Sequence, residues 1–239
     1  MVEKVVIGNA ELWHGDCREV MAELLPRSDL VLTDQPYGVS VLLHHGRTGP
    51  RLHERYIGLL NDSSQAVGVE VLLFAESVGV PTIAFSSPMK PWPGQWDQHL
   101  VWDKGPALGG GGNTKRTWKN CFEVIQVARI DRLRLGRDSS VLKFWDSPSH
   151  GRDHITQKPV KLMMYLVMQA SDPGLCIFDP FAGSGSTGVA AVTAGRRFIG
   201  VEVHRPYFDI ACKRIDCAQS QGQLLPPEEP RQPVQDGVF

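Results

Sequence analysis

Four consecutive residues, Asp34-Gln35-Pro36-Tyr37, bring together groups that suit chemistry on a planar amine. The Asp34 carboxylate and the Gln35 backbone carbonyl could accept both hydrogens of an exocyclic amino group on a base, and would stabilise positive charge as its nitrogen reacts. Pro36 restricts Gln35 to an extended conformation, and the Tyr37 ring could stack on a base swung out of its helix. These four residues are our catalytic candidates, although the tetrad alone also fits an ordinary turn that follows a strand and buries an aspartate.

A glycine-rich stretch, residues 179–188, follows one predicted strand and opens one predicted helix. Glycines let the backbone turn tightly and approach a ligand closely, and a helix N-terminus offers free amide donors. Glu202 ends the next predicted strand, where a carboxylate can accept hydrogen bonds from ribose hydroxyls. Gly183, Gly185 and Gly188 fit the GxGxxG pattern, so a dinucleotide cofactor and a tight turn without any ligand both remain open.

Several motifs resemble those of DNA amino-methyltransferases, which modify adenine N6 or cytosine N4. The resemblance rests on the Asp179-Pro-Phe-Ala-Gly-Ser-Gly loop, on His154-Ile-Thr-Gln-Lys-Pro159, on Gly15-Asp16-Cys17 and on the tetrad, in which Gln35 stands where the family has a proline. It implies S-adenosylmethionine as the cofactor, although Asp16 taken alone is equally a helix N-cap. The implied cofactor-binding residues are Asp16, Cys17, Thr156, Gln157, Lys158, Asp179, Pro180, Phe181, Gly183, Ser184, Gly185, Ser186, Thr187 and Glu202.

The order of the motifs resembles the permuted β class of this family, because the tetrad precedes the glycine loop. In that class the target-recognition region lies between the two, which corresponds to about residues 129–153 here. A leading aspartate in the tetrad is commoner in adenine-N6 members and a serine in cytosine-N4 members, so the resemblance favours adenine N6, with cytosine N4 as the alternative. The implied substrate is double-stranded DNA. A homodimer and a companion restriction endonuclease are partners that the resemblance leaves open.

Basic residues are concentrated in one segment, although the formal net charge is only −1. Residues 104–158 hold eleven Lys and Arg against five Asp and Glu, which suits a surface that faces phosphates. A solvated charged face explains the same pattern equally well. The residues that we expect to contact DNA are Lys115, Arg116, Arg132, Arg134 and Arg137.

Predicted strands and helices alternate along the chain, which indicates an α/β protein with a largely parallel sheet between helices. With the resemblance, this favours a Rossmann-like methyltransferase fold with a mostly parallel seven-stranded sheet, helices on both faces and a permuted motif order. Ligands bind beyond the carboxyl ends of such strands, so we expect the tetrad and the glycine loop to meet there. The expected strands are residues 10–14, 28–33, 81–86, 99–103, 122–128, 175–178 and 198–203, and the expected helices are 17–25, 67–78, 159–172, 185–194 and 207–215.

The remaining features limit the class of protein. We expect one catalytic domain, residues 1–218, and a disordered proline-rich tail, residues 219–239. The five cysteines include no CxxC pair, so we expect no disulfide framework and no metal site, and a cytoplasmic location. Charges and a proline interrupt the longest apolar stretch, so no membrane partner is expected. RNA or protein-amide methylation, dinucleotide-dependent oxidoreduction and non-catalytic DNA binding remain as alternatives.

Overall fold

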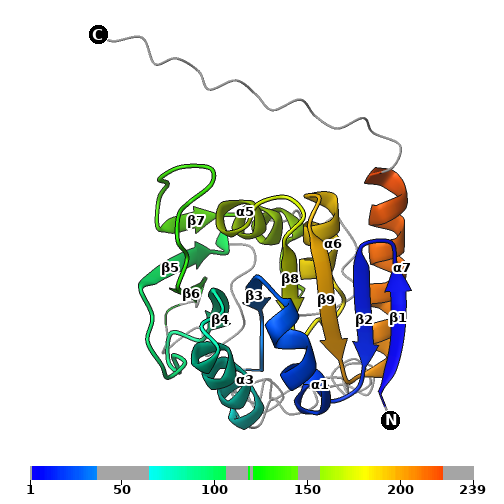
Figure 1. Ribbon diagram of the computed structural model, residues 1–239. Helices are drawn as coiled ribbons and strands as arrows, with labels where there is room; N and C mark the ends of the chain where they lie inside the picture. The colour runs from blue at the N-terminus through cyan, green and yellow to red at the C-terminus, as the bar shows by residue number, and fades with distance from the viewer. Residues whose placement is uncertain (1, 37–64, 106–117, 119–120, 145–156, 223–239) are drawn as a thin grey trace.

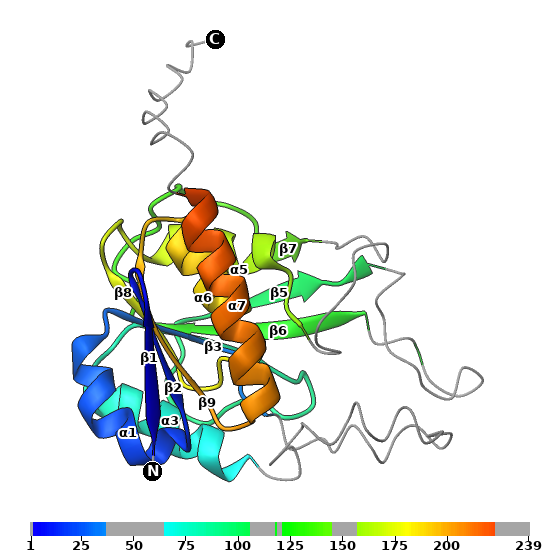
Figure 2. The ribbon, with the colours of Figure 1, turned by 90° about the vertical axis from the view of Figure 1, so that its right-hand side faces the viewer.

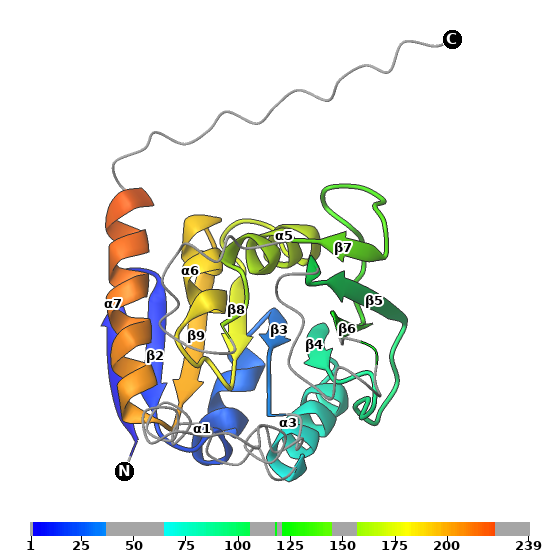
Figure 3. The same ribbon diagram turned by 180° about the vertical axis from the view of Figure 1, so that it is seen from behind.

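One mixed β-sheet runs through the computed structural model, which describes residues 2–36, 65–105, 118, 121–144 and 157–222. Helices α1 and α3 cover one face of the sheet, and α5, α6 and α7 cover the other (Figures 1 and 3). Figure 2 shows the two helix layers on either side of the strands. The strands are β1 (Glu3–Ile7), β2 (Ala10–His14), β3 (Leu30–Thr33), β4 (Thr82–Ser86), β5 (Gln98–Asp103), β6 (Phe122–Ala128), β7 (Val141–Lys143), β8 (Cys176–Asp179) and β9 (Arg197–Glu202). The helices are α1 (Cys17–Leu24), followed by a 3-10 turn (Leu25–Arg27), α3 (Ala66–Ser77), α5 (Val160–Ala170), α6 (Ser186–Thr193) and α7 (Arg205–Gly222).

The central strands run parallel, which places their carboxyl ends at one edge of the sheet. The strand order within the described residues is β1-β2-β9-β8-β3-β4-β6-β5-β7. Strands β2, β9, β8, β3 and β4 pair in parallel, whereas β6 lies antiparallel between β4 and β5. Therefore β5 and its parallel neighbour β7 point the same way as β4. We call the end marked by the arrowhead of β9, at the bottom of Figure 1, the carboxyl edge and the opposite end the amino edge.

The middle of the sheet is apolar on both faces because helices cover both. Every residue of β3 and of β8 is buried, as expected for parallel strands between two helix layers. Leu162 of α5 and Ile215 of α7 belong to the core on one face, and Val20 of α1 and Val71 of α3 belong to the core on the other. Burying each such side chain stabilises the fold by roughly 1.5–3 kcal/mol. The two cores therefore support the strand ends from both sides.

The α/β fold with a mostly parallel sheet and helices on both faces is confirmed, and all seven expected strands are found to within two residues. The expected number of strands, seven, is corrected to nine. The described sheet has one further strand on each of its two sides, β1 and β7. Strand β1 pairs with β2 across the two-residue turn Gly8-Asn9, in which Gly8 has a φ of 52°, as tight hairpins require. Strand β7 has three residues, of which only Leu142 is buried. An alternation of this length is too short to predict a strand from the sequence.

Helix α7 is longer than the sequence suggested and continues through Gly222. Its last turns pack against the β1–β2 turn, since a Cβ on Gly8 would lie only 2.5 Å from the Gln219 amide nitrogen. Residues 219–222, which we had assigned to the tail, therefore belong to the helix, and residues 223–239 lie outside the described residues. In the part of the chain that the structure describes, no helix is long and apolar enough to cross a bilayer.

Candidate active site

Three acidic residues reach the carboxyl edge because they close three neighbouring strands. Asp34 follows β3, Asp179 ends β8 and Glu202 ends β9. Strands β3, β8 and β9 lie side by side in the sheet. The tetrad and the glycine loop therefore meet at one edge, although they are far apart in the sequence.

The carboxylate of Asp34 is paired with a buried lysine. The Nζ atom of Lys158 lies 2.6 Å from Oδ2 of Asp34 and 3.1 Å from Oε2 of Glu123, the second residue of β6. Glu123 also accepts a hydrogen bond from Lys104, with 3.1 Å between Nζ and Oε1. Only 6% of the Lys158 side chain is exposed, and its Nζ lies 4.9 Å from the centroid of the Phe85 ring. We call Asp34, Lys158, Glu123 and Lys104 the charged cluster.

The charges of this cluster alternate in sign, which favours their ionised forms. Burial alone would lower the pKa of Lys158, but the carboxylates of Asp34 and Glu123 outweigh it and raise that pKa above its ordinary value. Burial alone would raise the pKa of Glu123, and Lys158 and Lys104 instead hold it below its ordinary range. Asp34 therefore lies beside a lysine that stays protonated. A carboxylate in its ionised form can only accept hydrogen bonds. This suits a group that must accept a hydrogen from an amine.

The glycines of the loop between β8 and α6 are needed for different reasons. Gly183 and Gly185 both have positive φ, 54° and 81°. A Cβ on Gly185 would lie 2.9 Å from the Cβ of Ala211 in α7, and one on Gly188 would come within 2.4 Å of the same helix. These two glycines are needed for packing. A Cβ on Gly183 would meet, among the described residues, only the carbonyl of Phe181 at 3.9 Å, so this side of the loop is open to a ligand.

Protein contacts fix the shape of this loop. Asp179 accepts hydrogen bonds from the Thr187 hydroxyl at 2.6 Å and from the Phe181 backbone N–H at 3.1 Å. Burial raises the pKa of Asp179 to about 6. Arg214 of α7 donates to the backbone carbonyl of Ser184 at 2.5 Å and to its hydroxyl at 3.0 Å. A ligand would therefore meet a preformed loop.

Glu202 ties the loop to β9 and retains hydrogen-bonding capacity. Its Oε2 accepts from the backbone N–H of Gly183 at 2.8 Å, and its Oε1 accepts from that of His204 at 2.7 Å. Burial raises the pKa of Glu202 to about 7, even though these backbone N–H groups act in the opposite direction. Each oxygen of a carboxylate has two lone pairs, so both can still accept from a ligand hydroxyl. This is the property that a ribose-binding carboxylate needs.

Seven buried side-chain polar atoms have no hydrogen-bond partner within the described ranges, and two of them belong to predicted cofactor-binding residues. These two are the hydroxyl of Ser186, the first residue of α6, and Oε1 of Gln157, next to Lys158. A buried polar group left unpaired costs about 1–3 kcal/mol, so such atoms are candidates for ligand contacts. Together with the open side of Gly183 and the free lone pairs of Glu202, they fit the S-adenosylmethionine expected from the sequence.

Asp16 and Cys17 follow β2 at the same edge, and Asp16 has a clear structural role. Its carboxylate accepts from the backbone N–H of Arg18 at 3.0 Å and caps α1, so the N-cap interpretation is confirmed. It also pairs with the Arg18 guanidinium, and these hydrogen bonds lower the pKa of Asp16. Cys17 is buried, which raises the pKa of its thiol to about 12. A contact between these two residues and an adenine ring stays a prediction.

The other predicted site residues divide into those that the structure places and those that lie outside the described residues. Gln35 and Pro180 are buried, and Pro36 and Phe181 are half-buried. Lys158, which the resemblance assigns to the cofactor, contacts Asp34 and Glu123, and its contact with a cofactor stays a prediction. The predicted site residues outside the described ranges are Tyr37, Lys115, Arg116 and Thr156.

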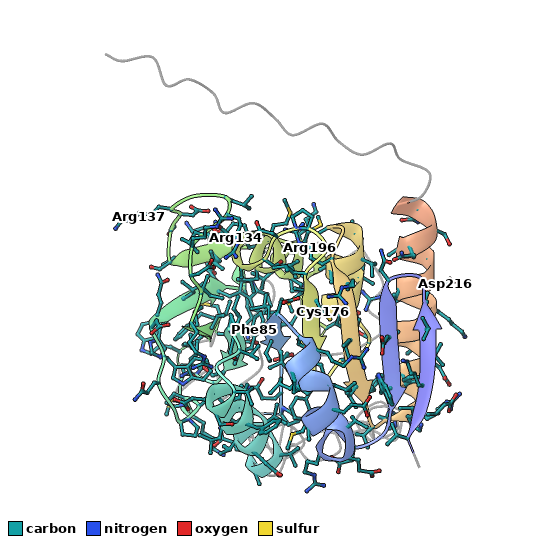
Figure 4. All side chains as sticks on the ribbon, in the orientation of Figure 1. Phe85, Arg134, Arg137, Cys176, Arg196 and Asp216 are labelled. Atoms are coloured by element: carbon teal, nitrogen blue, oxygen red, sulfur yellow. The ribbon has the colours of Figure 1, made fainter. Side chains whose placement is uncertain are left out.

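Three arginines expected to contact DNA lie at the amino edge. Arg132 and Arg134 each approach Asp172, in the turn before β8, at 3.4 Å, and Arg134 has only 14% of its side chain exposed. Arg137 is exposed. Figure 4 places Arg134 and Arg137 at the end of the sheet opposite the arrowhead of β9. The antiparallel course of β6 explains this, because it carries the chain to the amino edge before residue 129. This position does not support contact between these arginines and a base held at Asp34.

Glu123 and Lys104 are part of the site, and the sequence analysis did not identify either. Glu123 shares one face of β6 with Ile125 and Val127, because side chains alternate along a strand, and both of those are in the core. A charged residue on the inward face of a strand was therefore the feature of the sequence that could have identified Glu123. Lys104 directly follows β5 and has no comparable signal, because only the pairing of β5 with β6 brings it to Glu123.

The sequence is similar to a known family and to known proteins. A family model described as DNA methylase, for N6 and N4 enzymes, matches residues 88–213, more than half of the chain. The DNA adenine methyltransferase YhdJ of Escherichia coli (strain K12) is 39% identical over 80 residues, which cover 31% of this chain and 27% of YhdJ. YubD of the same strain is 29% identical over 215 residues, which cover 86% of this chain and 90% of YubD.

Solved structures share the fold. The M1.HpyAVI–SAM complex superposes with a TM-score of 0.60 at 21% identity, covering 87% of this chain and 99% of that one. The cytosine-N4-specific PvuII DNA methyltransferase also gives a TM-score of 0.60, at 16% identity, covering 91% of this chain and 93% of that one. Both comparisons support the same arrangement of sheet and helices.

Proposed function

The chain belongs to the N6/N4 DNA methylase family, and from this premise we propose that it transfers a methyl group from S-adenosylmethionine to adenine N6 in double-stranded DNA. The observation that carries the proposal is the ion pair between the half-buried Asp34 and the buried Lys158 at the carboxyl edge. The strands beside it end in Asp179 and Glu202, so an amine acceptor and a nucleoside-binding loop share one edge.

Asp34 and Gln35 are the groups that act on the target amine. The lone pair of an exocyclic amine is delocalised into the base, so the nitrogen is a poor nucleophile. The Asp34 carboxylate accepts one of its hydrogens and the backbone carbonyl of Gln35 accepts the other, which favours a tetrahedral nitrogen and stabilises its growing positive charge. Lys158 donates to Oδ2 of Asp34 at 2.6 Å and holds this carboxylate in place. Tyr37 is proposed to stack on the flipped base.

The cofactor is proposed to occupy the loop between β8 and α6. Glu202 would accept from its ribose hydroxyls, and the open side of Gly183 would accommodate its close approach. Ser186 and Gln157 would pair their free polar atoms with it. When bound, S-adenosylmethionine supplies an electrophilic sulfonium methyl group. The protein holds the amine in line with that methyl group, and such orientation can provide a major share of the acceleration.

Adenine is preferred over cytosine on two observations. The tetrad begins with Asp34, and YhdJ, which is similar over 80 residues, is named as a DNA adenine methyltransferase. Cytosine N4 is the second candidate, because the PvuII enzyme with the same fold is cytosine-N4-specific. Both bases present the same kind of amine to Asp34, so the surrounding pocket decides between them.

The DNA is proposed to approach the carboxyl edge, where Asp34 lies. Strand β5 ends and β6 begins at this edge, so the chain that carries Lys115 and Arg116 leaves and returns there. Those two residues remain our proposed phosphate contacts. A homodimer and a companion restriction endonuclease also remain predictions, the first of which sedimentation of the purified protein would test.

The direct test is methyl transfer with the purified protein. Double-stranded DNA of mixed sequence is incubated with S-adenosylmethionine, digested to nucleosides and analysed by mass spectrometry. We expect N6-methyldeoxyadenosine. N4-methyldeoxycytidine alone would contradict the choice of base, and no methylated nucleoside from a folded, cofactor-binding protein would contradict the proposed activity.

A further inference from the structure

Gln35 occupies the position at which the resembling family has a proline, and this removes a ring that would fix the backbone. A proline locks its own φ near −65°, which fixes one of the two torsions that orient its carbonyl. A glutamine has no such ring, and Pro36 confines Gln35 only to the broad extended region. If the Gln35 carbonyl is to receive a hydrogen from the target amine, another part of this chain must restrict it.

The Gln35 side chain is held by a buried tryptophan. It is 1% exposed, and in the amide orientation that satisfies both groups, its oxygen accepts from Nε1 of Trp92 at 2.6 Å and its nitrogen donates to the Thr33 carbonyl at 3.2 Å. The Trp92 indole N–H also donates to the Phe85 carbonyl at 2.7 Å, so its one hydrogen is shared between that carbonyl and the Gln35 oxygen. The Gln35 amide is thus tied directly to the end of β3, and to β4 through the indole of Trp92.

Trp92 is itself held firmly on both sides. Its backbone N–H donates to Oε1 of Gln126 at 2.8 Å, and Nε2 of Gln126 donates back to the Trp92 carbonyl at 3.3 Å. Gln126 is a buried residue of β6. The sheet therefore fixes the indole that contacts Gln35.

Helix α3 packs against the side chains of both Gln35 and Trp92. A Cβ on Gly68 would lie 3.0 Å from Cγ of Gln35 and 3.0 Å from the Trp92 ring. Gly68 is buried in the first turns of α3, so the helix backbone packs directly against both side chains. The Gln35 side chain is confined between a helix and an indole, with both ends of its amide hydrogen-bonded.

We propose that Gln35 is a positioning residue, whose side chain, clamped by Trp92 and Gly68, replaces the missing proline ring in aiming the Gln35 carbonyl at the target amine. This role rests on the proposed methyl transfer. It differs from ordinary core packing, because loosening the clamp slows the chemical step and leaves cofactor binding unchanged.

A double-mutant cycle tests the role. The four proteins are the unmodified chain, Trp92→Phe, Gln35→Pro and the double variant, and their kcat and their KM for S-adenosylmethionine are measured. Trp92→Phe keeps a ring but loses the N–H, so we expect kcat to fall about three- to tenfold, the range of one ordinary hydrogen bond, with unchanged KM. In the Gln35→Pro background the proline ring restricts the backbone that carries the carbonyl at position 35. We therefore expect Trp92→Phe to have no further effect on kcat in that background. The cycle compares ratios and does not require Gln35→Pro to match the unmodified rate.

Trp96→Phe is the matched control. Trp96 lies in the same segment and donates to the carbonyls of Trp92 and Pro93, both at 3.2 Å, without an observed contact to Gln35 among the described residues. We expect its kcat to equal that of the unmodified protein. If Trp92→Phe shows no cooperative melting, Gln35→Met is measured instead, since it loses the amide but keeps the length of the side chain. It should show the same fall in kcat.

The outcomes separate this role from the function on which it rests. No methyl transfer by the unmodified protein would contradict the proposed function and this role with it. Normal transfer combined with an equal Trp92→Phe effect in both backgrounds would overturn the positioning role alone. So would a Trp92→Phe or Gln35→Met protein with unmodified kcat.

Discussion

At the scale of single residues, the site depends on keeping one carboxylate ionised inside the protein. An isolated buried charge is costly, and a buried pair is tolerated only when its geometry and its remaining hydrogen bonds are good. Lys158 meets this requirement by contacting both Asp34 and Glu123, while Lys104 neutralises the second carboxylate. The cluster thus holds two positive and two negative groups. Removing any one of them should affect the others.

Lys158→Met should shift the pH profile of kcat. Without the ammonium, Asp34 loses its cation and is left near the like charge of Glu123, and both changes raise the pKa of a carboxyl. The acid limb of the profile should therefore move upward, and kcat at neutral pH should fall. Lys161→Met, an exposed position one residue into α5, is the control. An acid limb that stays in place in Lys158→Met would show that the pair does not govern Asp34.

Glu202 should make the ligand-free protein less stable as the pH rises. Burial raises its pKa from 4.5 to about 7. Below pH 4.5 the carboxyl is protonated in the folded and the unfolded chain. As the pH rises towards 7 the unfolded chain loses this proton first, so the stability that it contributes is progressively lost.

Glu202→Gln isolates this contribution, because the amide cannot ionise. The melting temperature of the variant relative to the unmodified protein should increase between pH 5 and pH 8. Asp179, whose pKa burial raises to about 6, acts in the same direction in both proteins. Scanning calorimetry across this range provides the measurement, and parallel curves would contradict the assignment.

At the scale of elements, the loop between β8 and α6 separates structural from ligand-facing glycines. Gly185→Ala should lower the melting temperature markedly, because its Cβ would meet α7 at 2.9 Å and its φ is 81°; strain of this kind costs about 1–3 kcal/mol. Gly183→Ala shares the strain of a positive φ, 54°, but among the described residues its Cβ would meet only the Phe181 carbonyl at 3.9 Å, so its loss of stability should be smaller, while S-adenosylmethionine binding falls at least tenfold. Calorimetric titration and melting curves of both variants test this contrast. Equal losses of affinity and stability in the two proteins would contradict it.

The sequence predicted the site best where chemistry and strand ends coincide. The tetrad, the glycine loop and Glu202 each follow a buried strand, so a parallel sheet necessarily brings them to one edge. The partners of these residues could not be predicted in this way. Glu123 and Trp92 reach the site through the antiparallel insertion of β6 beside β4, and no local pattern encodes which strands pair.

Strand direction also explains the position of Arg132, Arg134 and Arg137. The sequence shows a basic segment between the two motifs, which suggests a surface beside the catalytic site. Because β6 is antiparallel to β4, the chain leaves it at the amino edge, where Arg134 joins Asp131 and Asp172. A charge count reports the sign of a segment and carries no information about the end of the sheet at which it lies.

Arg134→Met should therefore affect stability more than DNA binding. Its guanidinium bonds two acids and the carbonyl of Arg132, and its side chain is largely buried. We expect the melting temperature to fall by about 2–4 °C, the shift that roughly 1 kcal/mol causes in a protein of this size, with an unchanged KM for DNA. Arg137→Met, at an exposed neighbouring position, should change neither. A KM for DNA that rises severalfold in Arg134→Met alone would return this residue to the DNA interface.

At the scale of the whole molecule, the two ends of the sheet, the carboxyl edge and the amino edge, carry different groups. The carboxyl edge carries the acids, the glycine loop and the buried lysine, and the amino edge carries ion-paired arginines that hold the turns before β7 and β8. Helices on both faces leave the carboxyl edge as the place where a base and a cofactor can meet. The family to which the chain belongs acts on DNA, so this edge is where we place the substrate.

The most direct test of DNA amino-methylation is modification-sensitive long-read sequencing of genomic DNA. The DNA comes from a methylation-deficient host that expresses either this protein or its Asp34→Ala variant, with equal soluble amounts and equal S-adenosylmethionine affinity of the two proteins verified beforehand. We expect N6-methyladenine at one short recognition sequence with the unmodified protein and none with Asp34→Ala. The same methylation from both proteins, or from neither, would contradict the role of Asp34 as the acceptor that activates the target amine.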